Sequence, residues 1–255
     1  MGDYPDLKGK VAIVTGAATG LGRADGIALG REGAKVVVTD INEGGGKELA
    51  AALNATRPGT ALFLKQDVRD EERWQEVVAE TVRHFGGLHV LVNNAGVVVI
   101  ATPETCTLEQ FRLQNAVMSE GTFLGCKHAI PAMRASGGGS IINMSSVASH
   151  LGYPVYFAYS AAKGAVRSMT KAIAVHCQMQ KYNIRCNSIH PGAIETQMVR
   201  DSTRELGMEM SAWEQTPQGL GRPEDVANAV VFLASDESRF VNGAELLIDN
   251  ALCAQ

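Results

Sequence analysis

Residues 156–166, YFAYSAAKGAV, place two tyrosines, a serine and a lysine in an otherwise apolar segment. Tyr159 and Lys163 are four residues apart, so they share one face if the segment is helical. A free phenol has a pKa of about 10 and is a poor base at neutral pH, but a nearby positive charge lowers that pKa. Tyr159 could then exchange a proton with an alcohol. Tyr156 lies two helical turns from Lys163, too far for direct coupling, so the spacing favours Tyr159 as the base.

A Y-x-x-x-K pair alone is weak evidence, because most such pairs are a packed tyrosine beside a solvated lysine. Other polar groups strengthen it by following apolar, β-branched runs. Ser146 follows the run at 140–144, Asp67 follows 61–66, and the sequence NNAG at 93–96 follows 89–92. Ligands of open α/β sheets lie beyond the carboxyl ends of the strands. We therefore expect Ser146 on the ligand side, where it could hold a substrate oxygen by hydrogen bonding.

A glycine-rich turn, TGAATGLG at 15–22, follows the first apolar run at 10–15. Glycines allow a tight turn and let backbone N–H groups approach a pyrophosphate at a helix N-terminus. The next run ends at Asp40, whose carboxylate can accept hydrogen bonds from an adenosine ribose and would repel a 2′-phosphate. Its neighbours Thr39 and Ile41 supply no arginine for that phosphate. The pattern favours NAD over NADP.

The elements that must position these groups are short strands alternating with longer helices. Alternation of this kind predicts one α/β domain over 1–255, with a doubly wound parallel sheet covered by helices on both faces. The polar, Met-rich stretch at about 197–220 is expected to be a lid or an irregular excursion. Strands are expected at 10–15, 35–39, 61–66, 89–92, 140–144, 185–189 and 245–248, and helices up to about 32 and at 71–85, about 107–135, about 158–180 and 223–234.

Composition restricts the classes of protein that fit. The 255 residues are 45% hydrophobic and 20% charged, with a formal net charge of −4 that offers no basic footprint for nucleic acid. The five cysteines form no C-x-x-C pair and the six histidines show no H-x-x-x-H spacing, so no metal site is expected. No apolar run reaches the length of about 18 residues that a membrane span needs. These features predict a soluble cytoplasmic protein that binds neither nucleic acid nor a membrane.

Taken together, TGAATGLG, Asp40, Asp67, NNAG, Ser146, YSAAK at 159–163 and PGAIET at 191–196 resemble the short-chain dehydrogenase/reductase family from about residue 7 to 249. The resemblance implies a single Rossmann domain of about seven parallel strands, an NAD cofactor, and usually a homotetramer. It implies that Ser146 orients the substrate oxygen, that Tyr159 is the acid/base, and that Lys163 lowers the tyrosine pKa and binds the nicotinamide ribose. Ser146 lies 13 residues before Tyr159, as it does in the family.

The resemblance also assigns a cofactor site. Asn93 and Gly96 would line its adenosine side, while Ile194 and Thr196 would meet the carboxamide. The full expected set is Gly16, Thr19, Gly20, Leu21, Asp40, Ile41, Asp67, Val68, Asn93, Ala95, Gly96, Tyr159, Lys163, Pro191, Gly192, Ile194 and Thr196.

One position departs from the family pattern. A fourth catalytic residue, an asparagine, is expected in the pattern N-x-x-G-x-F after the NNAG strand. The matching stretch here is 118–123, MSEGTF, which puts Met118 in its place, and Asn115 lies nearly one turn earlier. This departure leaves room for a catalytically weak NAD-binding or regulatory protein as an alternative to an enzyme.

The substrate site is expected to be apolar, since ligand pockets mostly are and methionine adapts to bulky surfaces. Its expected residues are Val98, Leu151, Tyr153, Tyr156 and Met198. The segments SIINMSSVAS, NSIHPGAIET and FLASDES most resemble the sequences of bacterial hydroxysteroid dehydrogenases. This resemblance favours a bulky secondary alcohol or ketone as the substrate. A second hypothesis is a β-ketoacyl-carrier-protein reductase, which Asp40 disfavours. An enoyl reductase is disfavoured because the spacing between tyrosine and lysine is wider in that group than in this sequence.

Overall fold

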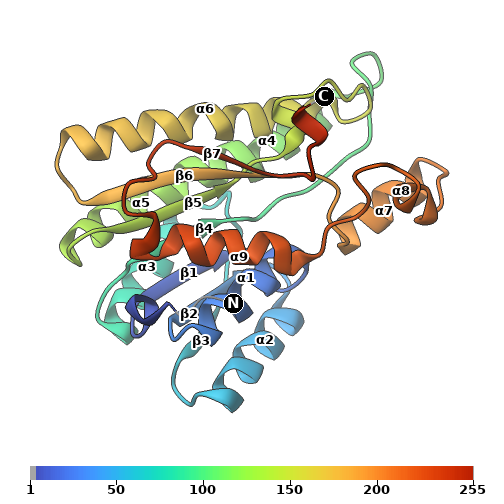
Figure 1. The fold of residues 1–255 in the computed structure, drawn as a ribbon. Coiled ribbons are helices and arrows are strands. Elements are labelled where there is room, and N and C mark those ends of the chain that lie inside the picture. The colour runs from blue at the N-terminus through green and yellow to red at the C-terminus, as the bar shows by residue number, and fades with distance from the viewer. Residues whose placement is uncertain (1–3, 255) are drawn as a thin grey trace.

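A seven-stranded parallel sheet forms the centre of the computed structural model, which describes residues 4–254 (Figure 1). Its strand order is β3-β2-β1-β4-β5-β6-β7, so the chain starts in the middle and winds out to both edges. The strands are β1 (Val11–Thr15), β2 (Lys35–Asp40), β3 (Ala61–Lys65), β4 (Val90–Asn93), β5 (Gly139–Met144), β6 (Ile184–Pro191) and β7 (Glu245–Ile248). The predicted fold class is confirmed.

Helices cover both faces of this sheet. One face packs against α1, α2 and α9, and the other against α3, α5 and α6. The helices are α1 (Gly20–Arg31), α2 (Glu43–Thr56), α3 (Glu71–Phe85), α4 (Leu108–Asn115), α5 (Gly121–Ala135), α6 (Phe157–Met179), α7 (Gln197–Glu205), α8 (Ser211–Glu214) and α9 (Pro223–Ala234). None within the described part of the chain is long and apolar enough to cross a membrane.

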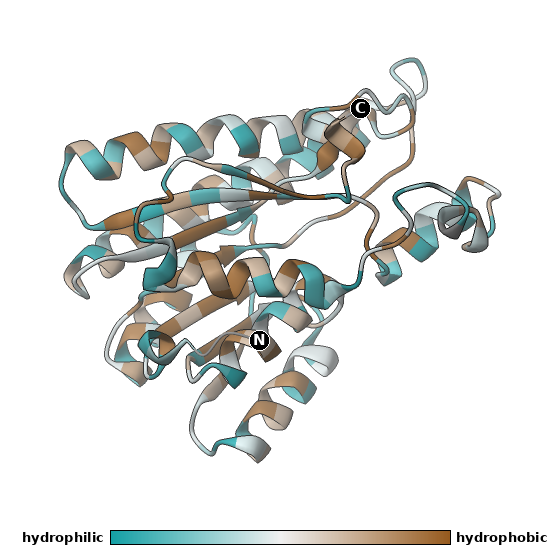
Figure 2. Ribbon diagram, in the orientation of Figure 1, coloured by the Kyte–Doolittle hydropathy of each residue, from teal (hydrophilic) through white to brown (hydrophobic). Residues whose placement is uncertain are grey.

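Alternation along each strand explains how one sheet supplies two hydrophobic cores. Val36 and Val38 of β2 pack into the core under α1, α2 and α9, whereas Val37 between them packs into the core under α3, α5 and α6. Successive side chains of a strand point to opposite faces, so a strand covered on both sides must be apolar throughout. Figure 2 shows this as hydrophobic strands flanked by helices that are hydrophilic outside.

Capping side chains determine where several helices begin. Asp70 accepts a hydrogen bond from Arg73 N in α3, and Thr107 with Gln110 forms a capping box at α4. Asn42 caps α2 in the same way by accepting from Gly45 N at 3.2 Å. Helix α2 was not expected from the sequence, because three glycines, which are poor helix formers, follow its first residue.

The stretch at 107–135 is not one regular helix. A π-helical turn at Ala116–Glu120 separates α4 from α5, although a single helix was expected there. The expected lid at about 197–220 contains two helices, α7 and α8. Trp213 of α8 donates to Thr203 Oγ1 of α7 at 2.9 Å, so the two helices are held together.

Candidate active site

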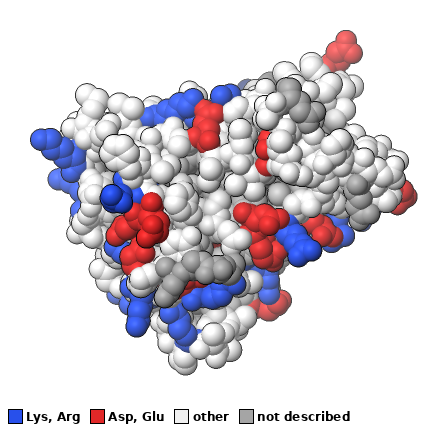
Figure 3. All heavy atoms as spheres, in the orientation of Figure 1, with Lys and Arg blue, Asp and Glu red and all other residues white. Residues whose placement is uncertain are grey.

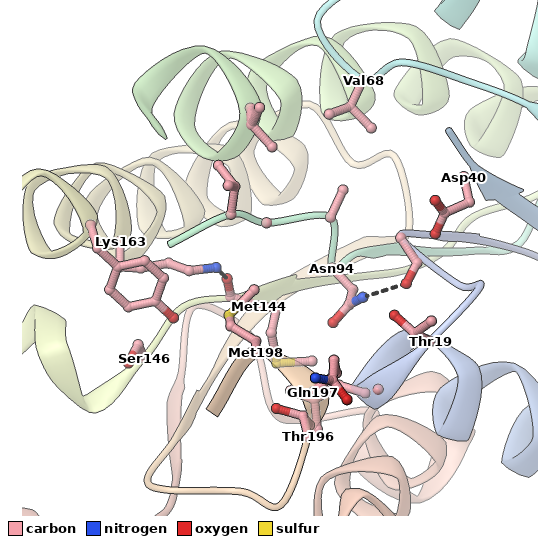
Figure 4. A pocket seen from close by; sticks show the side chains of 18 of the residues that line it. Thr19, Asp40, Val68, Asn94, Met144, Ser146, Lys163, Thr196, Gln197 and Met198 are labelled. Atoms are coloured by element: carbon pink, nitrogen blue, oxygen red, sulfur yellow. Dashed lines mark hydrogen bonds between the residues drawn. The ribbon is translucent and has the colours of Figure 1, made fainter. Parts of the chain in front are cut away.

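A cavity of about 470 Å³ lies beyond the carboxyl ends of β1, β2, β4, β5 and β6, with α7 along one side (Figure 4). Parallel strands all end at this edge, so turns distant in sequence meet there. Ser146, Tyr159 and Lys163 all line it. It also brings together most of the expected cofactor and substrate residues: Gly16, Thr19, Gly20, Leu21, Asp40, Ile41, Asp67, Val68, Ala95, Gly96, Pro191, Gly192, Ile194, Thr196 and Met198.

Five expected site residues lie elsewhere. Asn93 is buried beneath the cavity, where its amide donates to Asn143 Oδ1 at 2.9 Å. Tyr153 lines a separate cavity beside Trp213. The remaining three, Val98, Leu151 and Tyr156, are not among the residues that line the site cavity. Only Met198 of the expected substrate residues reaches it.

Ten lining residues are not among the expected site residues given above: Gln66, Arg69, Asn94, Val97, Leu113, Val117, Met144, Ser145, Gln197 and Val199. Asn94 had a visible signal, since it belongs to NNAG. Its amide donates to the backbone oxygens of Thr15 at 3.0 Å and Gly16 at 3.2 Å, which joins the β4 turn to the glycine-rich turn (Figure 4). Leu113 near the end of α4 and Val117 in the π-helical turn had no such signal.

The glycine-rich turn fits a dinucleotide. Gly16 and Gly20 have φ values of +63° and +55°, which L side chains rarely adopt. A Cβ atom on Gly16 would also lie 2.8 Å from Ala95 Cα. The turn leads into the N-terminus of α1, where free N–H groups favour a pyrophosphate. This loop can approach a bound phosphate with its backbone alone.

Asp40, Asp67 and Arg69 line the cavity at the end where the adenosine of a dinucleotide would lie. Asp40 Oδ2 accepts from Ala18 N at 2.9 Å and Oδ1 from Asn42 N at 2.8 Å, so its carboxylate is fixed beside the glycine-rich turn. Arg69 also lines this end, but its guanidinium is paired with Asp67 at 2.6 Å. Hydrogen bonds from Arg69 hold the pKa of Asp67 below its usual range. Arg69, the only arginine among the described residues that line the cavity, is therefore already paired.

Gln66 provides a separate test of whether a ligand fits. Its side chain is 2% exposed and lines the cavity, yet neither amide atom has a hydrogen-bond partner among the described residues. A buried, unsatisfied amide is costly unless a ligand or water completes it. Together with the glycine-rich turn, Gln66 makes the site suited to a polar cofactor such as NAD.

Burial dominates the electrostatics of Tyr159 and Lys163. Lys163 Nζ donates to the Met144 backbone oxygen at 2.6 Å, and desolvation lowers its pKa to about 8. Desolvation raises the pKa of Tyr159 to about 12, with the Ser146 hydroxyl opposing that shift. Lys163 Nζ lies 5.6 Å from the centroid of the tyrosine ring. That Lys163 and a positively charged nicotinamide together lower the pKa of Tyr159 stays a prediction for the protein with its cofactor bound.

Ser146 is positioned to donate a hydrogen bond. It ends the turn after β5 and is 8% exposed. Its Oγ accepts from Ala148 N at 3.1 Å, which occupies a lone pair and leaves the hydroxyl proton free. Ser146 and Tyr159 both line the cavity, and the serine hydroxyl lies close enough to the phenol to affect its pKa. A substrate oxygen between them would meet two O–H groups.

Met118 is packed rather than solvated. It is 1% exposed, and a Cβ atom on Gly96 would lie 3.6 Å from its Sδ, so the thioether fills the space under the β4 turn. Asn115 donates its amide to Phe111 O at 2.9 Å within its own helix. Asn115 is thus satisfied locally, as we expect if it does not replace the family's asparagine.

A parallel sheet with a glycine-rich turn after β1 and serine, tyrosine and lysine at its carboxyl edge defines a dinucleotide-binding oxidoreductase. The chain belongs to the short-chain dehydrogenase/reductase family. A family model described as enoyl-(acyl carrier protein) reductase matches residues 16–251. The fold is similar to that of levodione reductase, with a TM-score of 0.91 and 32% identity over 97% of this chain and 98% of that one.

Curated relatives match over nearly the whole chain. The chain is 44% identical to the 3-beta-hydroxysteroid dehydrogenase of Comamonas testosteroni over 96% of both sequences. It is 41% identical to the NADP-dependent (R)-specific alcohol dehydrogenase of Lentilactobacillus kefiri over 98% of both. The predicted family is confirmed, and these relatives are named as dehydrogenases that differ in substrate.

Proposed function

We propose that the chain is an NAD(H)-dependent oxidoreductase that interconverts a bulky, hydrophobic secondary alcohol and its ketone, with hydroxysteroids among the candidate substrates. The observation that carries this proposal is one cavity with Ser146, Tyr159 and Lys163 at one end and Asp40 at the other. The names of the relatives support a dehydrogenase acting on an alcohol or steroid. We further propose a cytoplasmic homotetramer.

The site residues divide the chemistry between them. NAD, once bound, would supply the hydride acceptor and a positive charge that favours the phenolate. In oxidation, the Tyr159 phenolate accepts the proton of the substrate hydroxyl while the hydrogen on the carbinol carbon leaves as hydride, which yields the ketone. Ser146 donates a hydrogen bond to the same oxygen in both directions. In reduction, the raised pKa of Tyr159 keeps it protonated, so the phenol can donate to the carbonyl oxygen.

The preference for NAD rests on Asp40 and Arg69. A 2′-phosphate beside the fixed Asp40 carboxylate would be repelled, and Arg69 is already paired with Asp67. We expect kcat/KM to be higher with NAD than with NADP. Asp40→Ala should shift the ratio of these two kcat/KM values towards NADP by tenfold or more, since one charge contact contributes on the order of 1.4 kcal/mol. Equal kcat/KM values for the two cofactors in the unmodified protein would contradict the assignment.

A bulky substrate is supported by the apolar residues on the nicotinamide side of the cavity, among them Val97, Leu113, Val117, Met198 and Val199. Remote apolar contacts can help to position the reacting carbon. NAD reduction should be measured with a series from propan-2-ol through aryl carbinols to hydroxysteroids. We expect kcat/KM to rise with apolar size, and best activity on the smallest alcohol would contradict the proposal.

Met118 supports a second candidate, a catalytically weak NAD-binding protein that lacks the family's full proton relay. The same substrate series separates the two candidates. Tight NADH binding without turnover on any alcohol or ketone would favour the second one.

A further inference from the structure

Outside the cofactor cavity, His150, His190 and Glu245 bring three potential metal-ligand atoms within 4.8 Å of one another. His190 is buried in β6, His150 follows the short helix that begins after Ser146, and Glu245 begins β7. Register between β6 and β7 places Ser188 opposite Glu245, which brings that carboxylate beside His190. The three residues are 40 and 55 positions apart, so no spacing motif reveals them.

The distances within this cluster match those between ligands of one metal ion. His150 Nε2 lies 3.0 Å from His190 Nδ1 and 3.4 Å from Glu245 Oε2. Two ligand atoms bound at 2.0–2.1 Å are about 3.0 Å apart at a right angle and about 3.4 Å apart at a tetrahedral angle. His190 Nε2 lies 2.8 Å from Ser188 Oγ, an outer partner of the kind that fixes the tautomer of a ligating histidine.

Without a cation, each placement of the shared histidine proton leaves one close contact between two acceptors. Desolvation lowers the pKa of both imidazoles, that of His190 to about 4, so each neutral ring carries one N–H. If His190 Nδ1–H donates to His150 Nε2, then His150 Nε2 carries no hydrogen and its lone pair lies 3.4 Å from the Glu245 carboxylate. If His150 Nε2 carries the hydrogen instead, the His190 Nδ1 lone pair faces the Ser146 backbone oxygen at 3.3 Å. Ser149 does not relieve this contact, because its hydroxyl donates to the same oxygen at 2.7 Å.

We propose that His150 Nε2, His190 Nδ1 and Glu245 Oε2 bind one divalent transition-metal ion of the class that prefers imidazole, which includes Zn²⁺, Co²⁺ and Ni²⁺. Neither ring needs to lose a proton, since the remaining N–H of His190 points to Ser188. Side-chain exposures of 17% for His150 and Glu245 leave a route from solvent. This site is independent of the proposed dehydrogenase activity.

Two cations set the expected strength of binding. Arg167 Nε lies 2.8 Å from Glu245 Oε2, and Lys171 pairs with Oε1. A carboxylate oxygen can accept a hydrogen bond and coordinate a metal through separate lone pairs, as ligating carboxylates often do. The two positive charges still oppose a third, so we expect weaker binding than at a closed structural zinc site.

Binding is tested with Co²⁺ on tag-free, chelator-treated full-length protein. We expect a visible d–d absorption band that saturates at one equivalent per chain and a rise in Tm of about 3 °C at saturation. Added Zn²⁺ should remove the band. No band and no change in Tm would show that the two histidines only share a hydrogen bond, and would overturn the proposal.

Variants locate the ion. His150→Gln and, independently, Glu245→Gln should lose the band and the Tm shift, and far-ultraviolet circular dichroism should confirm that each remains folded. His128→Gln is the matched control, because His128 contacts Glu71 at 3.1 Å without a second histidine, and it should bind as the unmodified protein does. Unchanged binding in His150→Gln, or a thiolate-to-cobalt charge-transfer band, would place the ion elsewhere and overturn the assignment.

Discussion

At the scale of single residues, the two tyrosines near Lys163 have different surroundings. Tyr159 lines the cavity beside Ser146, whereas Tyr156 lies outside it, with ring centroids 6.2 Å apart. We expect Tyr159→Phe to lower kcat by about 10²–10⁴-fold, because it removes the proton donor and acceptor. NADH binding, followed by fluorescence titration, should be nearly unchanged. Tyr156→Phe should have a much smaller effect, and an equal loss in both variants would contradict the assignment.

The buried Asp25 of α1 is expected to make the stability of the protein depend on pH. It is fully buried, neither carboxylate oxygen has a partner among the described residues, and burial raises its pKa well above its usual value. The folded state therefore holds the proton more tightly than the unfolded chain. Stability from this group is present below the unfolded pKa and is lost as pH rises through the folded pKa.

We accordingly expect Asp25→Asn to be more stable than the unmodified protein at pH 8, with a Tm gain of a few degrees that shrinks towards pH 5. Thermal unfolding of both proteins at several pH values measures this difference. Glu104→Gln, at an exposed position, serves as a control and should show no such trend. A Tm difference that does not depend on pH would mean that Asp25 is not a buried acid of raised pKa.

At the scale of elements, the interrupted helix between Leu108 and Ala135 decides the role of Met118. The offset between Asn115 and Met118 that a regular helix predicts does not hold here, because a π-turn begins at Ala116. The amide of Asn115 is nonetheless engaged with Phe111 O, so it does not reach the site as a substitute. Lys163 Nζ donates to Met144 O, and the thioether of Met118, only a weak acceptor, offers it no comparable partner.

From this arrangement we expect Asn115→Ala to change kcat less than about threefold, within the small range of surface substitutions. Met118→Asn should leave kcat unchanged or raise it modestly. Steady-state kinetics with saturating NAD measures both. Collapse of turnover in Asn115→Ala, with the fold and NADH binding intact, would show that Asn115 has taken over the missing role.

The secondary-structure elements differ in whether the sequence alone was enough to predict them. The strands were predictable, because β-branched runs such as 35–39 have one structure that buries them on both faces. Helix α2 was not, since its capping Asn42 had to outweigh three glycines. The π-turn left no local signal, and neither did the folding of 197–220 into α7 and α8, where Trp213 and Thr203 meet only in three dimensions.

At the scale of the whole molecule, the parallel sheet explains why so much of the site was predictable. All strands end at one edge, so Asp40, Ser146 and Lys163 could be assigned to one cavity without any knowledge of distances. What failed were side-chain directions: Asn93 points into the core and Tyr153 into another cavity. The His150–His190–Glu245 cluster was unpredictable for the same reason, because it depends on the register of β6 with β7.

The surface of the molecule bears on its assembly. On the face in Figure 3, acidic and basic residues are interspersed among uncharged areas. Large apolar side chains remain exposed on the helices that cover one face of the sheet, among them Phe123 of α5, and Phe157, Val175 and Met179 of α6. Large exposed apolar patches often mark interfaces between proteins. These residues are candidates for contacts between copies of the chain.

We expect the protein to elute as a homotetramer, with a light-scattering mass four times that of the chain. Val175→Glu should dissociate it into smaller species, because a charge buried at an interface without a partner is strongly unfavourable. Ile41→Glu, at a position that is also exposed but lines the cofactor cavity, is the control and should leave the mass unchanged. A monomer at micromolar concentration in the unmodified protein would contradict the assembly, and a tetramer in both variants would place the interface away from α6.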